Sequence, residues 1–283
     1  AGNEHDLARA LQGLERTAEA EELYRRALAT RRKRLGNSHA DVAETLNALA
    51  ICLLSTNRHD EAEPLLREAL GIRRKVLGNE NRAVAQTLDA LGGVFRRRGQ
   101  YAQAVKLYRE ASDILRKVEG PGHISLAYTL SLVGWCTAKA GDMPAAEQYL
   151  REALAITDKL RHARPGIRAS VLSSLGEVLY EQGKLPEAEP LKREALQMVK
   201  ETHGEEHADT ARGMTSLARC LRDQEDFDEA EAYARKALVV QRRLLPADLT
   251  PEALAIAEPT VRALEAKTRV VHDWELTGRL LAD

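Results

Sequence analysis

Residues 58–78 read RHDEAEPLLREALGIRRKVLG, and this stretch decides the fold because its pattern returns along the whole chain. Steps of 42 residues from Ala62 reach an alanine every time, at Ala20, Ala104, Ala146, Ala188 and Ala230. The column through Ala69 is also all alanine, at Ala27, Ala111, Ala153, Ala195 and Ala237. A third column, through Ala50, holds only alanine or glycine, at Ala8, Gly92, Gly134, Gly176 and Ala218. Three small-residue columns that persist through six copies identify a repeat protein.

Each copy is predicted to form two amphipathic helices. In the copy that begins at His39, apolar residues recur at spacings of three and four, which places them on one helix face: Val42, Leu46, Leu49 and Leu53. Residues 58–78 form the second helix. The turn between the two helices is expected where glycine or asparagine permits a positive φ. The column at that turn reads Asn57, Gly99, Gly141 and Gly183, and a second glycine column ends the second helices at Gly36, Gly78, Gly120 and Gly204.

The repeat columns also predict the domain organisation. We expect a helical array over residues 1–248 and a C-terminal helical cap over 249–283, because the small-residue columns fail after Pro246. The array divides into a partial repeat at 1–38 and repeats at 39–80, 81–122, 123–164, 165–206 and 207–248. Looser packing is expected at Lys192 and Ala234, which replace the large apolar residue of Tyr24, Leu66, Tyr108 and Leu150 in the same column. The chain starts within a repeat and has no initiator methionine, which suggests a piece of a larger protein.

Composition narrows the function classes. The net charge of −1 gives no indication of nucleic-acid binding. No apolar run approaches the ~20 residues of a membrane span, so we expect neither partner. Cys52, Cys136 and Cys220 share one column at steps of 84 residues, which places them ~20 Å apart because neighbouring helices pack ~10 Å apart. They are too distant for a disulfide, and a reducing cytoplasm is the expected location.

These features resemble the tetratricopeptide repeat (TPR). The resemblance lies in the repeat length, in TLNALA at 45–50, in DEAEPLLREAL at 60–70 and in the start at His39, and it covers about residues 5–248. The variety is similar to the 42-residue repeats of kinesin light chains and nephrocystin-like proteins. The resemblance implies an all-α fold, a right-handed α-solenoid of stacked antiparallel helix pairs. It also implies that the first helices line a concave groove that holds peptides.

If the first helices line such a groove, four columns should face it. We expect the peptide-binding residues to be Asn47, Ile51, Leu54, Asp89, Arg96, Arg97, Ser131, Trp135, Lys139, Ser173 and Tyr180. Short polar groups suit a peptide backbone, Ile51, Leu54 and Trp135 suit an apolar or aromatic anchor, and the basic residues suit carboxylates. Arg and Trp are also frequent among residues that dominate binding energy. The alternative is that Trp135 packs between repeats and that the basic residues are ordinary solvated surface.

Catalytic chemistry is not expected. His203-Gly-Glu-Glu-His207 matches a zinc-protease spacing, but it spans a turn between repeats, where Gly204 and His207 are already explained by the columns. No glycine-rich phosphate loop or nucleophile elbow is present. We therefore expect no enzyme activity, no metal and no cofactor.

The sequence thus predicts a scaffold that holds a protein or peptide segment, acidic and with an aromatic or aliphatic anchor. The alternative function is a regulatory or sensor arm of a multidomain signalling enzyme, namely an ATPase, a kinase or a caspase-like protease. In that case the groove would engage another domain of the same parent protein.

Overall fold

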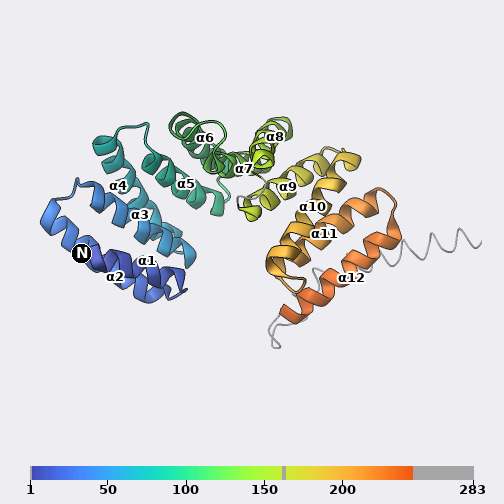
Figure 1. The fold of residues 1–283 in the computed structure, drawn as a ribbon, viewed down its shortest axis with the longest axis horizontal. Coiled ribbons are helices and arrows are strands. Elements are labelled where there is room, and N and C mark those ends of the chain that lie inside the picture. Colours follow the sequence, from blue (N-terminus) through green and yellow to red (C-terminus); the bar gives the residue numbers. More distant parts are fainter. Residues whose placement is uncertain (1, 161–163, 245–283) are drawn as a thin grey trace, which may run out of the picture. The chain divides into compact units, whose positions relative to one another are not determined.

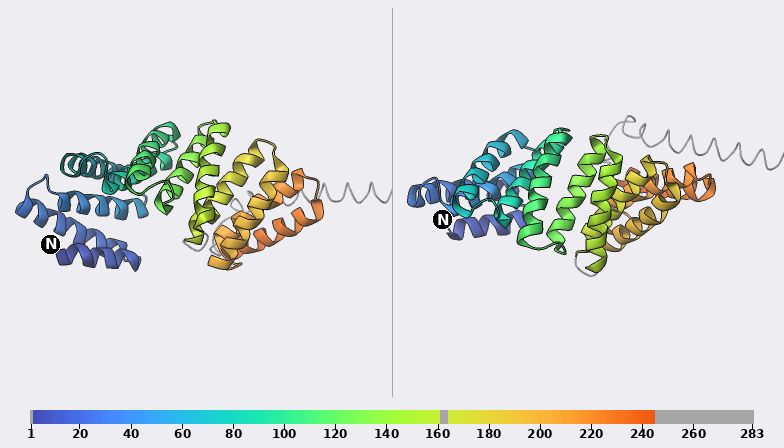
Figure 2. Two further views of the ribbon diagram at one scale, coloured as in Figure 1. Left: turned by 45° about the horizontal axis from the view of Figure 1, so that its top comes forward. Right: turned by 90° about the horizontal axis from the view of Figure 1, so that it is seen from above.

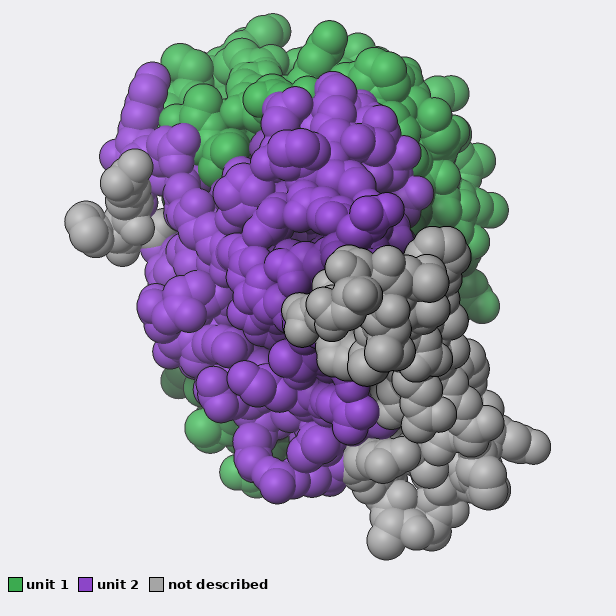
Figure 3. Space-filling model, turned by 90° about the vertical axis from the view of Figure 1, so that its right-hand side faces the viewer, with its two compact units in different colours: residues 1–156 green, residues 157–283 purple. Residues whose placement is uncertain are grey.

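The computed structural model describes residues 2–160 and 164–244, which form helices and no β-strand (Figure 1). The predicted cap, residues 249–283, lies outside this part. The chain divides into two units, Ala1–Ile156 and Thr157–Asp283, which are coloured separately in Figure 3. The helices of unit 1 are α1 (Gly2–Gly13), α2 (Thr17–Leu35), α3 (Ala40–Ser55), α4 (His59–Leu77), α5 (Arg82–Arg97), α6 (Tyr101–Val118), α7 (Ile124–Lys139) and α8 (Met143–Lys159), whose last turn enters unit 2. Unit 2 contains α9 (Pro165–Glu181), α10 (Leu185–His203), α11 (Ala208–Asp223) and α12 (Phe227–Leu244).

Within each unit the helices pack in chain order. In unit 1, α3 contacts α4, α4 contacts α5, α5 contacts α6, and α6 contacts α7. In unit 2, α9 contacts α10, α10 contacts α11, and α11 contacts α12. The ribbons show successive helices running side by side in opposite directions within each unit (Figure 2). The predicted fold class, an all-α solenoid of stacked helix pairs, is confirmed.

The small-residue columns lie where the two helices of a pair approach most closely. A Cβ atom added at Gly134 on α7 would lie 2.6 Å from Leu150 Cγ and 3.2 Å from the Ala146 carbonyl oxygen on α8. Ala146 itself is fully buried. A larger side chain at either position would therefore push the helices apart, which explains why the columns hold only alanine and glycine.

The predicted turns have the expected backbone. Asn57 has φ 61° and Gly99 has φ 72°, both in the left-handed region. The histidines before the first helices have a role that the columns did not reveal, because they cap these helices. His39 Nδ1 accepts a hydrogen bond from the Asp41 backbone N–H at 3.1 Å, and Asn81 does the same for Ala83 at 2.8 Å. Such a bond satisfies one of the free N–H groups that begin a helix.

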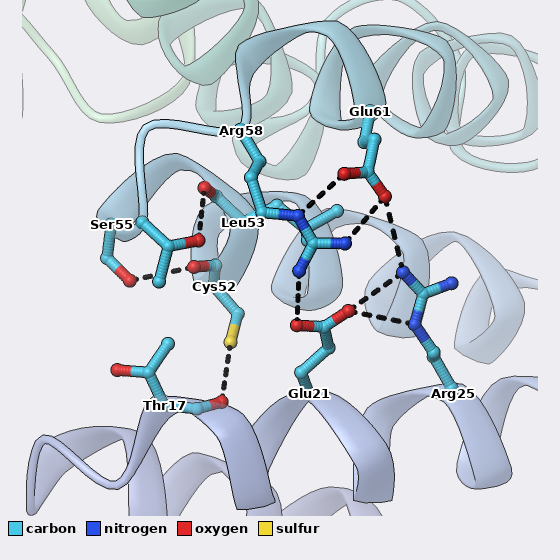
Figure 4. Close-up of polar contacts among 9 residues, drawn as sticks. Thr17, Glu21, Arg25, Cys52, Leu53, Ser55, Arg58 and Glu61 are labelled. Carbon is cyan, nitrogen blue, oxygen red and sulfur yellow. Dashed lines mark hydrogen bonds and ion pairs between the residues drawn. The ribbon is translucent and has the colours of Figure 1, made fainter.

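Polar contacts join the first repeats to each other (Figure 4). Arg58, at the start of α4, donates to Glu21 of α2 at 2.6 Å and to Glu61 of α4 at 2.6 Å. The Cys52 thiol of α3 donates to the Thr17 carbonyl oxygen at 3.4 Å. All three cysteines are buried and free, as expected. No described helix is long and apolar enough to cross a membrane.

Arg73 of α4 joins its repeat to the next one by hydrogen bonds to α5. It is only 6% exposed, and its Nη1 donates to the Ala83 carbonyl oxygen at 2.7 Å and to Thr87 Oγ1 at 2.6 Å, both on α5. Arg31 makes the equivalent bonds to Asp41 and Thr45 one repeat earlier.

We expect Arg73→Ala to lower the free energy of unfolding by ~2–3 kcal/mol, because hydrogen bonds from a charged group are lost and apolar stem contacts go with them. Arg73→Leu should cost less, since Leu115 occupies the equivalent position one repeat later and is buried there. Denaturant unfolding of the three proteins measures the difference. Equal midpoints for wild type and Arg73→Ala would show that Arg73 does not hold the junction.

Candidate peptide-binding site

All the predicted site residues lie on first helices. In unit 1, α3 carries Asn47, Ile51 and Leu54, α5 carries Asp89, Arg96 and Arg97, and α7 carries Ser131, Trp135 and Lys139. In unit 2, α9 carries Ser173 and Tyr180. The two groups belong to different units and are described separately.

Trp135 is the centre of the unit 1 group. Its indole is half-buried and meets the ring of Tyr101 on α6 edge-on, with centroids 5.6 Å apart. The guanidinium carbon of Arg96 lies 5.6 Å from the Trp135 ring centroid, and Lys139 Nζ lies 5.8 Å from it. Trp135 therefore packs between repeats and also contacts two cations. Such cation–π contacts contribute ~0.5–1 kcal/mol at exposed sites.

The basic residues around Trp135 lack acidic partners. Within the described residues, no carboxylate lies within ion-pair distance of Arg96, Arg97 or Lys139. The next residue along, Arg98, differs, because it pairs with Asp60 at 2.6 Å and with Glu63 at 2.5 Å. Arg97 and Lys139 are exposed and Arg96 is partly exposed. The surface formed by Arg96, Arg97, Trp135 and Lys139, here called the cation site, thus carries uncompensated positive charge.

Apolar surface lies one repeat away, on α3. Ile51 is 43% exposed, and Leu54 is partly buried one turn further on. These two residues are available to an apolar group of a ligand.

The short polar residues are more enclosed than the charged ones. Asn47 is 8% exposed and Ser131 is 4% exposed, and the Ser131 hydroxyl donates to the Tyr128 carbonyl oxygen at 2.7 Å. Asp89 Oδ2 accepts a hydrogen bond from Thr129 at 2.9 Å, whereas its Oδ1 is enclosed and has no hydrogen-bond partner among the described residues. Burial raises the pKa of Asp89 to about 7, although the bond from Thr129 acts in the opposite direction.

In unit 2 the two predicted residues have different surroundings. Ser173 is exposed, whereas the Tyr180 hydroxyl donates to Asp223 at 2.6 Å. Lys192 Nζ and the guanidinium carbon of Arg219 each lie 4.8 Å from the centroid of the Tyr180 ring. Tyr180 therefore already contacts two cations of its own unit.

Lys192 is buried, with 4% of its surface exposed, at a position where other repeats have a large apolar residue. Its Nζ donates to Glu177 at 2.5 Å and to Ser216 at 2.6 Å, so partners at hydrogen-bond distance compensate the buried charge. In the sequence, a lysine in a column of mostly apolar residues marked Lys192 as unusual. Its partners Glu177 and Ser216 lie on other helices, so the column could not identify them. Nothing in the sequence pattern marked Tyr101 as the residue whose ring contacts Trp135.

The fold and the site together define a helical-repeat protein whose first helices carry an uncompensated cation site. The chain belongs to the tetratricopeptide repeat family, whose model matches residues 2–75, 82–159 and 167–243. The predicted family is thereby confirmed. Repeats of this family typically mediate protein interactions. None of the curated protein sequences matches this chain.

Solved structures with the same fold include proteins with kinesin-light-chain repeats. BtubC (BKLC) from P. vanneervenii is 21% identical with a TM-score of 0.65, and the match covers 84% of this chain and 92% of that one. A putative kinesin light chain from Podosopora anserina with nearly identical TPR-like repeats is 23% identical with a TM-score of 0.60, over 71% and 95% of the two chains. A signal transduction ATPase (STAND) protein with a TPR sensor, from Pyrococcus horikoshii, is 15% identical with a TM-score of 0.72. That match covers 94% of this chain and 38% of the ATPase.

Proposed function

We propose that this protein is a cytoplasmic, non-catalytic scaffold that binds an acidic segment of a partner protein on the first helices of unit 1. The observation that carries the proposal is the cation site, where Arg96, Arg97 and Lys139 have no acidic partner among the described residues. Several other arginines of the array pair with a neighbouring repeat, as Arg74 does with Glu110. A ligand carboxylate would supply the missing counter-charge.

The ligand has two parts in this proposal. Its carboxylates pair with Arg96 and Lys139, which the Trp135 ring holds near one another. Its apolar or aromatic anchor packs on Ile51 and Leu54, one helix pair away. Arginine next to an aromatic ring is a frequent combination at positions that dominate binding energy, and charge complementarity of this kind raises association rates.

The test begins with an array of labelled peptides that combine one phenylalanine with several glutamates, each matched by a version with glutamine instead. The best binder is then titrated against the folded protein by fluorescence anisotropy. We expect the glutamate peptides to bind and the Arg96→Glu/Lys139→Glu variant to bind at least ~100-fold more weakly, since each reversed charge costs about tenfold or more. Binding should also weaken as salt increases.

The matched control is Lys106→Glu/Arg109→Glu. It makes the same change of charge at two exposed positions of α6 that also lack acidic partners among the described residues. This variant should bind within about threefold of wild type, because only long-range charge is altered. Equal losses in the two variants, or no preference for glutamate over glutamine peptides, would overturn the proposal.

The similarity to the STAND protein with a TPR sensor favours a second function. The match covers 38% of that protein. Here the array is the sensor arm of a larger signalling enzyme, and the acidic segment belongs to another domain of the same parent. The reading frame that surrounds this chain distinguishes the two, because only this second function requires a catalytic domain within it.

A further inference from the structure

Unit 2 contains cations at positions equivalent to the cation site, but these cations are paired within the unit. Arg219 of α11 lies in the column of Trp135, and Arg222 lies in the column of Arg96. Arg219 contacts Glu177 at 3.2 Å and Glu181 at 3.4 Å, both on α9. Arg222 pairs with Asp223 at 2.8 Å.

Glu177 is the hub of this network. One carboxylate oxygen accepts from Lys192 Nζ at 2.5 Å and from Ser216 at 3.2 Å, and the other accepts from Arg219 at 3.2 Å. Burial alone would raise the pKa of Glu177, but the Lys192 hydrogen bond and charge and the Arg219 charge hold it below its usual value. The group is therefore an anion at neutral pH.

We propose that Glu177 is a specificity-determining residue, an internal counter-anion that closes the unit 2 counterpart of the cation site to acidic ligands. The inference rests on the proposed function, in which an acidic segment binds at the cation site of unit 1. It adds that such a segment does not bind at the equivalent positions of unit 2. A ligand carboxylate that approached Arg219 would have to displace Glu177, which also holds the buried Lys192. The exchange replaces one ion pair by another and leaves Lys192 without its anion, so it gains no free energy.

The difference between the units appears when α9 and α11 are compared with α5 and α7, two repeats earlier. Glu177 and Glu181 of α9 occupy the positions of Gly93 and Arg97. On α11, Arg219 and Asp223 occupy the positions of Trp135 and Lys139, so unit 2 has three carboxylates where unit 1 has none. The same repeat geometry thus offers net positive charge in unit 1 and an internally neutralised surface in unit 2.

The test counts binding sites by isothermal titration calorimetry of the full chain with the glutamate peptide selected above. Wild type should bind one peptide. Glu177→Gln/Glu181→Gln should bind two, because Arg219 is released, and a further Arg219→Ala change should return the count to one. One peptide bound by the folded double variant, or two by wild type, would overturn the inference.

A second variant covers the case in which the unpaired Lys192 unfolds the protein. Glu177→Gln/Glu181→Gln/Lys192→Leu removes the buried amine as well, and Leu66 and Leu150 show that leucine is buried at this column. It should also bind two peptides, with circular dichroism as the check of folding. Failure of the proposed function has a different signature, since Arg96→Glu/Lys139→Glu would then leave the wild-type site intact.

Discussion

At pH 8 the Asp89→Asn protein should unfold at a clearly higher denaturant concentration than wild type, whereas at pH 4 the two should unfold at nearly the same concentration. The carboxyl lies on α5 with an enclosed, unpartnered Oδ1, and burial raises its pKa from 3.8 to about 7. Asparagine has the same shape, keeps an oxygen for the Thr129 hydroxyl and carries no charge at any pH.

The direction of the change of stability with pH follows from proton linkage. Between pH 3.8 and about 7 the folded protein binds a proton at Asp89 that the unfolded chain has released. Stability therefore falls as pH rises through this window and levels off above it. A shift of this size corresponds to at most ~4 kcal/mol of destabilisation at pH 8, which the asparagine variant would recover. The groups that face Asp89 include Thr129 and Tyr128 of α7.

The reciprocal variant is Asn47→Asp, at the equivalent buried position of α3. This variant should lose stability as pH rises, because the new carboxyl group ionises in a buried position, whereas Asn47 of the wild type does not titrate. Denaturant midpoints at several pH values between 4 and 8 measure both effects. Parallel pH profiles for wild type and Asp89→Asn would mean that the Asp89 carboxylate is well accommodated when ionised.

Ala146→Leu should destabilise the protein strongly, by ~2–3 kcal/mol. Ala146 is fully buried on α8, and its carbonyl oxygen would be 3.2 Å from a Cβ at Gly134 on α7. Three additional carbon atoms have no space at this crossing, and overpacking of this kind typically costs 1–3 kcal/mol. Ala155→Leu makes the same change on the exposed side of α8 and should be nearly neutral.

The same comparison can be made one repeat earlier. Ala104 is fully buried on α6, whereas Ala102 is exposed two residues before it. Ala104→Leu should lower the thermal unfolding midpoint by several degrees, and Ala102→Leu should leave it almost unchanged. If neither Ala104→Leu nor Ala146→Leu lowers the midpoint, the small-residue columns do not mark the crossings of the helices.

The columns predicted the backbone of the array well because each of them records a local steric requirement. Ala62, Gly134 and Asn57 are constrained by a helix crossing or a positive φ, and such constraints return with the repeat. The start of a repeat at His39 could be predicted but its capping role could not, because the hydrogen bond from the Asp41 N–H to His39 Nδ1 depends on the direction of the side chain. At α5 the cap is Asn81 instead of a histidine, so the column alone did not mark it.

The site was harder to predict because charges act between helices. The columns place Arg96 and Arg219 on the same kind of helix face, and only the structure separates the unpaired arginine from the paired one. Asp89 and Asn47 looked like surface polar groups in the sequence, but the packing of adjacent first helices encloses their oxygens. Enclosure of this kind depends on neighbouring helices, which a single column does not describe.

The helices of each unit contact mainly their immediate successors along the chain. Such a molecule can lengthen by duplication of one complete 42-residue segment, because each new junction copies a junction that already exists. Deletion of a few residues within a helix, in contrast, rotates the rest of that helix, so that its apolar face no longer meets its neighbours. Homologous arrays should therefore differ in length by whole segments, and those that keep the three consecutive first helices α3, α5 and α7 would keep the cation site and its apolar neighbours together.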